Sequence, residues 1–105
     1  NWVTNGITFT GTNTITIMAT SPNNSGMQTL HKQVQGAALL FYIRADENAQ
    51  IGVSLNNNTM DVPVTTEWQK YAVVYDSPAD TVQVRFYNFP INNNVYIKDI
   101  VLLDK

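Results

Sequence analysis

Hydrophobic and polar residues alternate with a period of two along most of the chain, and no segment repeats its apolar residues with the period of a helix. Because successive side chains of a β-strand point to opposite faces, this alternation predicts strands with one buried face. Clusters of Asn, Gly, Pro and Asp separate the alternating segments and predict turns. We therefore expect an all-β protein of eight or nine short strands.

The predicted strands can be placed from the alternation. They cover residues 7–10, 14–19, 27–35, 37–45, 50–55, 59–64, 68–75, 82–87 and 95–103. The turn at 11–13 predicts a hairpin between the first two, and Pro63, which lacks an N–H group, predicts an edge strand. In the last strand Val95 and Ile97 keep one phase while Ile100 and Leu102 keep the other, which predicts a β-bulge at 98–99.

Strands spaced roughly every ten residues are typical of a two-sheet antiparallel β-sandwich of the jelly-roll type. A chain of 105 residues has room for one hydrophobic core, and neither a repeat nor a linker interrupts it. We therefore expect a single domain over residues 1–105. Leu39, Phe41 and Ile43 alternate along one strand and are expected to lie on its buried face.

Charge and composition exclude several classes of function. The net charge is −2, and the six Lys and Arg residues are scattered, which argues against a nucleic-acid partner. The longest apolar run, residues 37–43, is far shorter than the ~20 residues that cross a bilayer, so no membrane insertion is expected. The chain has no cysteine for a disulfide or thiolate metal site. It lacks an initiator Met and a signal peptide, so we expect a segment of a longer parent protein whose other domains it contacts.

Three segments carry a resemblance to a known family: AALLFYIRA at 37–45, TEWQKY at 66–71 and VYIKDIVL at 95–102. Together they resemble the jelly-roll carbohydrate-binding modules that accompany glycoside hydrolases. The closing strand is also similar to accessory modules in tail and baseplate proteins of bacteriophages, and the likeness extends from Trp2 to Lys105. It implies a non-catalytic, sugar-binding module in an extracellular or virion protein, which recognises a saccharide of the bacterial cell wall or surface.

The family pattern also bears on metal binding. Many of the resembled modules carry an Asp of a structural calcium site where Lys98 stands in this chain. The lysine argues against calcium, although Asp99 beside it keeps a site open. We expect no cofactor. The family also usually has a further strand upstream of Asn1.

Catalysis lacks the necessary residues. The eight Asp and Glu residues fall at or near predicted strand ends and turns, which is typical of solvated carboxylates rather than of an acid/base pair for glycoside hydrolysis. His31 is the only histidine, so neither a nucleophilic triad nor a multi-histidine metal site can form. The chain is not expected to be an enzyme.

Binding a sugar requires an aromatic plane and groups that hydrogen-bond hydroxyls, and the strand at 82–87 presents both on its outward positions. We expect it to lie between the strands at 27–35 and 50–55, with Gly52 leaving room at the centre. In the resembled modules this sheet is the concave, ligand-holding one. The candidate ligand-binding residues are Gln83, Arg85, Tyr87, Gln50, His31, Gln33 and Ser54.

Other polar and aromatic residues have two readings. Tyr42 and Arg44 occupy the outer face of the opposite sheet, where they form either a competing site or a stabilising stack. The chain has 13 Asn and 12 Thr, and asparagines at 23–24, 56–58 and 92–94 either line the rim of the site or simply form turns. Trp2 is expected to plug the core.

Trp68 and Tyr71 are expected to anchor the core rather than to contact a ligand. We expect an adhesion accessory of a phage tail or baseplate protein, and two alternatives to it stay open. The first is a structural module that decorates a larger assembly without sugar affinity. The second is a substrate-targeting module of a secreted glycoside hydrolase.

Overall fold

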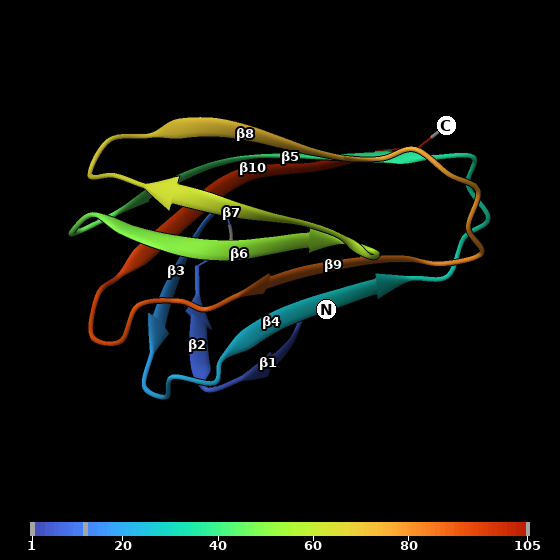
Figure 1. Ribbon diagram of the computed structural model, residues 1–105. Coiled ribbons are helices and arrows are strands. Elements are labelled where there is room, and N and C mark those ends of the chain that lie inside the picture. The colour runs from blue at the N-terminus through green and yellow to red at the C-terminus, as the bar shows by residue number, and fades with distance from the viewer. Residues whose placement is uncertain (1, 12, 105) are drawn as a thin grey trace.

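The computed structural model describes residues 2–11 and 13–104, with the backbone alone for Phe9. It confirms the predicted two-sheet antiparallel β-sandwich of the jelly-roll type (Figure 1). Within the described residues there is no helix, and so none that is long and apolar enough to cross a membrane.

Sheet A lies in front in Figure 1 and has the strand order β1-β4-β9-β6-β7. Its strands are β1 (Val3–Asn5), β4 (Ser25–Leu30), β9 (Val82–Tyr87), β6 (Ala49–Leu55) and β7 (Asn58–Val64). Each neighbouring pair is antiparallel. The central position of β9 places its outward side chains in the middle of the sheet face, and β7, which carries Pro63, is an edge strand as predicted.

Sheet B packs behind sheet A and has the order β2-β3-β10-β5-β8. Its strands are β2 (Ile7–Thr10), β3 (Thr14–Ala19), β10 (Val95–Asp104), β5 (Ala37–Ala45) and β8 (Gln69–Tyr75). The predicted hairpin between β2 and β3 is confirmed, with Ile7 opposite Ala19. The predicted bulge is confirmed as well: the register of β10 against β5 shifts between Lys98 and Val101, and Asp99 has a φ of 53°.

Two features of the strand prediction were wrong. Strand β1 was not predicted, because its three residues are all exposed and show no alternation of buried and exposed positions. The strand predicted at 27–35 ends at Leu30. Leu30 pairs with Val82, the first residue of β9, and no strand partner continues beyond that pair. The chain then leaves the sheet, making an isolated bridge between Val34 and Ala79.

Alternating residues of both sheets fill the interior. Phe41 of β5 and Phe86 of β9 are fully buried and meet edge to face, with their ring centroids 5.2 Å apart. Trp2 packs on Phe86 with a centroid separation of 5.6 Å, so its role as a plug on the core is confirmed. Tyr71 also packs against the core, as predicted.

Trp68 does not anchor the core. It is half-buried just before β8 and makes its contacts with two cationic side chains, Arg44 and Lys98. The prediction overlooked the alternation of the strand itself: Tyr71 and Val73 point inward, so position 68 falls in the outward phase. Trp68 therefore belongs to the outer face of sheet B, together with Arg44 and Lys98.

Candidate functional site

Strand β9 presents three polar side chains on the outer face of sheet A. Val82, Val84 and Phe86 point into the core, so the alternating residues Gln83, Arg85 and Tyr87 point outward. Gln83 and Arg85 are exposed and Tyr87 is half-buried. The orientation predicted from the sequence is therefore confirmed for all three.

The strands that flank β9 are β4 and β6, as expected. The register builds two rows of outward side chains across the sheet. One row reads Asn5, Ser25, Tyr87, Gly52 and Asp61, and the next reads Val3, Met27, Arg85, Ser54 and Thr59. We call these two rows, together with Gln83 and Gln50, the sheet A face.

Gly52 and Tyr87 lie against each other at the centre of the sheet A face. A Cβ atom at position 52 would lie 2.3 Å from Cε2 and 2.4 Å from Cζ of Tyr87, far inside van der Waals contact. The room that Gly52 leaves is therefore filled by the Tyr87 ring. The guanidinium carbon of Arg85 lies 4.7 Å from the centroid of the same ring, within the range of a cation–π contact.

Ser54 and Gln50 flank this centre on β6. Ser54 lies opposite Arg85 and is only 7% exposed, whereas Gln50 lies opposite Pro63 and is exposed. The centre of the face thus combines a guanidinium group, a phenol ring and a mostly covered hydroxyl, with amides at its margins.

His31 and Gln33 do not share this face. Both are exposed in the segment that follows β4, so the structure places them beyond the edge of the face. If β4 continued, the alternation would point both side chains outward, like those of Met27 and Thr29. The strand ends at Leu30, before it reaches them. Alternation alone does not indicate where a strand loses its partner.

Sequence reasoning missed several residues of the sheet A face. Asp61 was taken for a solvated turn carboxylate, yet β7 places it opposite Gly52, in the Tyr87 row. Met27 of β4 lies opposite Arg85, and Thr29 lies opposite Gln83. The signal that was available is the hairpin of β6 and β7, in which Thr59, Asp61 and Pro63 share one face.

Several loop asparagines serve the fold rather than the rim of a site. Asn24 is buried, donates through Nδ2 to the carbonyl oxygens of Ser21 (2.7 Å) and Phe89 (3.1 Å), and accepts through Oδ1 from the N–H of Phe89 (2.7 Å). Asn93 is similarly bonded to the backbone N–H and carbonyl of Glu47. Asn56 bonds the N–H of Gln83 and the carbonyl of Thr81. The amides of these residues hold turns together, which is the second of the two alternatives that the sequence left open.

The asparagine turns themselves are confirmed in part. Asn56, Asn88 and Asn92 have φ angles of 53°, 59° and 61°. Asparagine tolerates this left-handed conformation better than most residues because its amide bonds locally.

The competing pair, Tyr42 and Arg44, lies on the outer face of sheet B, as alternation predicted. The guanidinium carbon of Arg44 is 4.2 Å from the ring centroid of Tyr96. The Tyr96 hydroxyl donates to Oδ1 of Asp46 (2.9 Å), and this hydrogen bond is the main reason that the pKa of Tyr96 is raised above its ordinary value. Asn94 donates to the other oxygen of Asp46 (3.1 Å).

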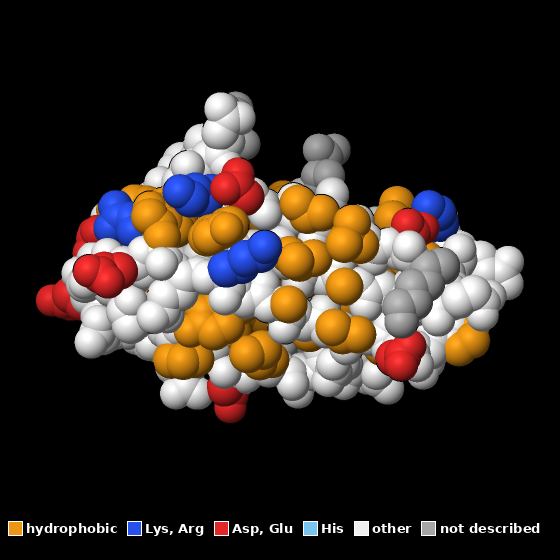
Figure 2. All heavy atoms as spheres, turned by 90° about the horizontal axis from the view of Figure 1, so that it is seen from above, with side chains coloured by type: hydrophobic (Ala, Val, Ile, Leu, Met, Phe, Trp, Pro, Cys, Tyr) orange, Lys and Arg blue, Asp and Glu red, His pale blue; other side chains and the backbone are white. Residues whose placement is uncertain are grey.

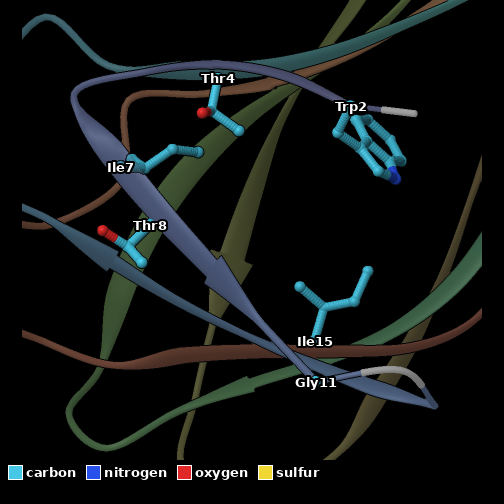
Figure 3. A pocket seen from close by; sticks show the side chains of 6 residues that line it. All are labelled: Trp2, Thr4, Ile7, Thr8, Gly11 and Ile15. Carbon is cyan, nitrogen blue, oxygen red and sulfur yellow. The ribbon is translucent and has the colours of Figure 1, made fainter.

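A cleft opens between the two sheets at the edge formed by β1 and β2. It has a volume of about 490 Å³, and the described residues that line it are Trp2, Thr4, Ile7, Thr8, Gly11 and Ile15 (Figure 3). An adjoining hollow of about 460 Å³ shares Trp2 and Ile15 with it and reaches Asp99. Sequence analysis missed this cleft because its walls come from two sheets.

Two charged groups outside both sheet faces' centres form an ion pair. Lys32 forms a salt bridge with Asp104, and the hydrogen bond and charge of Lys32 lower the pKa of that carboxyl group. Within residues 2–11 and 13–104, no three His, Asp or Glu side chains gather in a group that suits a metal ion.

Comparison with known proteins finds solved structures with a similar fold. No family model matches the chain, and no curated protein matches its sequence. Among solved structures, a family 4 carbohydrate-binding module superposes with a TM-score of 0.72 at 18% identity, covering 95% of this chain and 79% of the other. The N-terminal cellulose-binding domain of Cellulomonas fimi β-1,4-glucanase C gives a TM-score of 0.66 at 12% identity, covering 99% and 88%.

A viral protein shares the fold as well. The enzymatically active domain of tailspike protein 4 of bacteriophage CBA120 superposes with a TM-score of 0.73 at 16% identity. The match covers all of this chain but 19% of the tailspike chain. Taken with the strand order and the register, these likenesses show that the chain has the jelly-roll fold of carbohydrate-binding modules.

Proposed function

We propose that the chain is a non-catalytic carbohydrate-binding module that holds a saccharide on the sheet A face. The observation that carries this proposal is the packing of Tyr87 into the space above Gly52, with Arg85 stacked on its ring. An aromatic side chain at the centre of a sheet, with a guanidinium group beside it, offers the apolar surface and the N–H donors that a sugar ring and its hydroxyls require.

Each residue of the face has a role in this proposal. Arg85 and Gln83 orient hydroxyl groups, and Tyr87 contributes the apolar surface. Asp61 adds an acceptor in the same row as Tyr87, so hydroxyls can donate as well as accept. Ser54 and Gln50 complete the floor and margin on β6.

Fold likeness supports the class of ligand. Solved neighbours include a family 61 module in complex with β-1,4-galactotriose, with a TM-score of 0.60 at 11% identity. Galactotriose is the ligand of that neighbour. For this chain we propose only that the ligand is a saccharide. The aliphatic and aromatic interior and the dispersed carboxylates support a binding role over a catalytic one.

A titration with surface polysaccharides of bacteria tests the site. A face of this size is expected to bind with a Kd of about 10⁻⁶ to 10⁻³ M, because few hydrogen bonds and one ring contact offset the cost of association. Arg85→Ala and Tyr87→Ala are each expected to weaken binding roughly tenfold or more. Lys32→Ala and Gln35→Ala, which change exposed side chains outside the face, serve as controls. Unchanged binding by both face variants would refute the site.

We further propose that the module serves as an adhesion accessory of a phage tail or baseplate protein, at the virion surface, and attaches through several copies acting together. The tailspike likeness supports this context, whereas the likeness to a cellulose-binding domain of a β-1,4-glucanase supports the alternative, a module of a secreted glycoside hydrolase. Reading the sequence on both sides of the chain in its parent tests it: tail or baseplate segments are expected, and a hydrolase catalytic domain would contradict it.

One observation favours a second candidate, a structural module in contact with other domains of its parent. Val74, Val101 and Leu103 point outward from sheet B and are 49%, 45% and 54% exposed. Rows of exposed aliphatic side chains often mark contact surfaces. The same titration separates the two candidates, because a purely structural module binds no saccharide.

A further inference from the structure

Six side chains on the outer face of sheet B form a regular pattern of aromatic and cationic residues. Tyr96 lies opposite Arg44, and Lys98 lies opposite Tyr42, which itself lies opposite Lys70. Trp68 contacts Arg44 from the segment that leads into β8. The two rows are Tyr96, Arg44 and Trp68, then Lys98, Tyr42 and Lys70. Ring and cation alternate along and between the rows, so we call these six residues the checkerboard.

Contacts with the rings hold every cation of the checkerboard in place. Arg44 Cζ lies 4.2 Å from the ring centroid of Tyr96 and 5.5 Å from that of Trp68. Lys98 Nζ lies 4.3 Å from Trp68 and 5.8 Å from Tyr42, and Lys70 Nζ lies 5.7 Å from Tyr42. Each contact is within the range in which a ring attracts a cation. The long side chains are thereby partly ordered before a ligand arrives, which lowers the entropy lost on binding.

The cations of the checkerboard form no salt bridge within the described residues, and the carboxylate of Asp46 at its margin is bonded to the hydroxyl of Tyr96. Three of the six Lys and Arg residues of a chain with net charge −2 lie here. In the part of the chain that the structure describes, the salt bridge joins Lys32 to Asp104, and none involves Arg44, Lys70 or Lys98. Figure 2 shows Lys and Arg side chains among hydrophobic ones toward one end of the molecule, with Asp and Glu side chains beside them.

The chemistry of these groups selects a class of ligand. Lysine and arginine only donate hydrogen bonds, so the surface offers many donors and few acceptors. A neutral sugar, whose hydroxyls both donate and accept, matches this surface less well than a sugar with a carboxylate. The half-buried rings offer apolar surface to the C–H groups of a pyranose, and an acidic peptide has no such apolar face of C–H groups.

Spacing favours a polymer over a single sugar. Lys98 and Lys70 stand on β10 and β8, two strands apart with Tyr42 of β5 between them. Their backbone positions are therefore about 10 Å apart across the sheet, since neighbouring strands lie about 4.8 Å apart. Arg44 lies in the adjacent row. A linear chain with repeated carboxylates can contact more than one of these cations at once.

We propose that the checkerboard is a second binding site, which takes an acidic polysaccharide built of uronate units. The site is independent of the sheet A face, since the two lie on opposite outer surfaces of the sandwich. It needs no metal and no movement of the backbone.

The test uses polygalacturonate, its fully methyl-esterified form as the uncharged match, and poly-aspartate as a polyanion without sugar rings. Binding of the whole chain is followed by calorimetric titration at low salt and in about 0.5 M NaCl, where the Debye length is only about 4 Å. We expect polygalacturonate to bind with a Kd of about 10⁻⁵ to 10⁻³ M and both other polymers to bind roughly tenfold more weakly. Added salt weakens the polygalacturonate complex.

Variants assign the binding to the checkerboard. Lys98→Gln and Arg44→Gln are each expected to weaken polygalacturonate binding roughly threefold to tenfold. Trp68→Ala is expected to weaken it about as much, and its thermal unfolding is recorded to verify the fold. Lys32→Gln removes the same charge at a distant site and is the matched control.

Three results would overturn the proposal. These are the absence of binding to polygalacturonate, equal binding of poly-aspartate, which would indicate an acidic peptide partner, and equal effects of Lys98→Gln and Lys32→Gln. Tyr87→Ala separates this site from the proposed function, because it acts on the sheet A face alone: loss of polygalacturonate binding in Tyr87→Ala would show a single shared site and overturn the second one.

Discussion

At the scale of single residues, Gly52 determines how the sheet A face is built. A glycine in the middle of a strand carries a cost in backbone entropy, because it has more conformational freedom in the unfolded chain than any other residue. Here the missing Cβ makes room for the ring of Tyr87, which approaches to a distance that no side chain at position 52 would allow. The arrangement of Tyr87 and Arg85 thus depends on a residue that has no side chain.

Replacing Gly52 with alanine is therefore expected to change binding more than stability. The new Cβ would displace the Tyr87 ring, which is the far end of a movable side chain, so the free energy of unfolding should change by less than about 1 kcal/mol. Saccharide affinity should fall, because the ring and the stacked guanidinium group move. Chemical denaturation and polysaccharide titration measure the two effects.

A double-mutant cycle provides the control for this expectation. In a Tyr87→Ala background, Gly52→Ala should have no further effect on affinity, since the ring that it displaces is already absent. If the two changes weaken binding additively, the packing of Tyr87 on Gly52 has no part in the site.

At the scale of elements, buried amides of loop residues determine where the strands begin and end. Asn24 precedes β4 and bonds both the N–H and the carbonyl of Phe89, which follows β9. These two strands are neighbours in sheet A, so the Asn24 amide joins them at their common end. The amide makes the hydrogen bonds to Phe89 that a backbone N–H and C=O would make if the strand pairing continued.

Removing the Asn24 amide is expected to destabilise the fold strongly. Asn24→Ala leaves buried backbone groups of Phe89 without partners, and the free energy of unfolding should fall by about 2 kcal/mol or more. Asn23→Ala, at the exposed neighbouring position, should change it by less than about 0.5 kcal/mol. Equal effects in urea denaturation would contradict the role given to Asn24.

Elements were largely predictable from sequence, and sites were predictable in part. Alternation over residues 82–87 identified the outward side chains of β9, and the change of phase after Ile97 identified the bulge, because both are local signals. The end of β4 at Leu30 depends on where its partner ends, which is a property of the assembled sheet. The checkerboard likewise needs the register of three strands, so Tyr42 and Arg44 were recognised while Lys70 and Lys98 were not.

At the scale of the whole molecule, the two sheets are joined by aromatic contacts at the centre of the core. Phe41 belongs to sheet B and Phe86 to sheet A, and their rings meet nearly at right angles, with an interplanar angle of 85°. This edge-to-face contact adds to the burial of both side chains. Trp2 also contacts the Phe86 ring, in a tilted arrangement with the centroids 5.6 Å apart.

Paired substitutions are expected to measure this link between the sheets. Phe41→Leu and Phe86→Leu should each lower the free energy of unfolding, and together they should show a coupling of about 0.5 to 1.5 kcal/mol. Phe86→Leu combined with Val101→Ala, a change on the outer face of sheet B, should be additive. A coupling of zero between the two phenylalanines would show that burial alone accounts for their contribution.

The position of β10 in the middle of sheet B has a consequence for synthesis on the ribosome. Strand β10 comes last in the chain, yet it is the strand that joins β3 to β5. Until β10 emerges from the exit tunnel, sheet B consists of two separate strand pairs, β2-β3 and β5-β8. The edges of β3 and β5 that β10 will join are then open to hydrogen bonding. Such edges attract other chains. A chaperone that covers nascent strands would therefore protect this segment most until the ten residues of β10 have been translated.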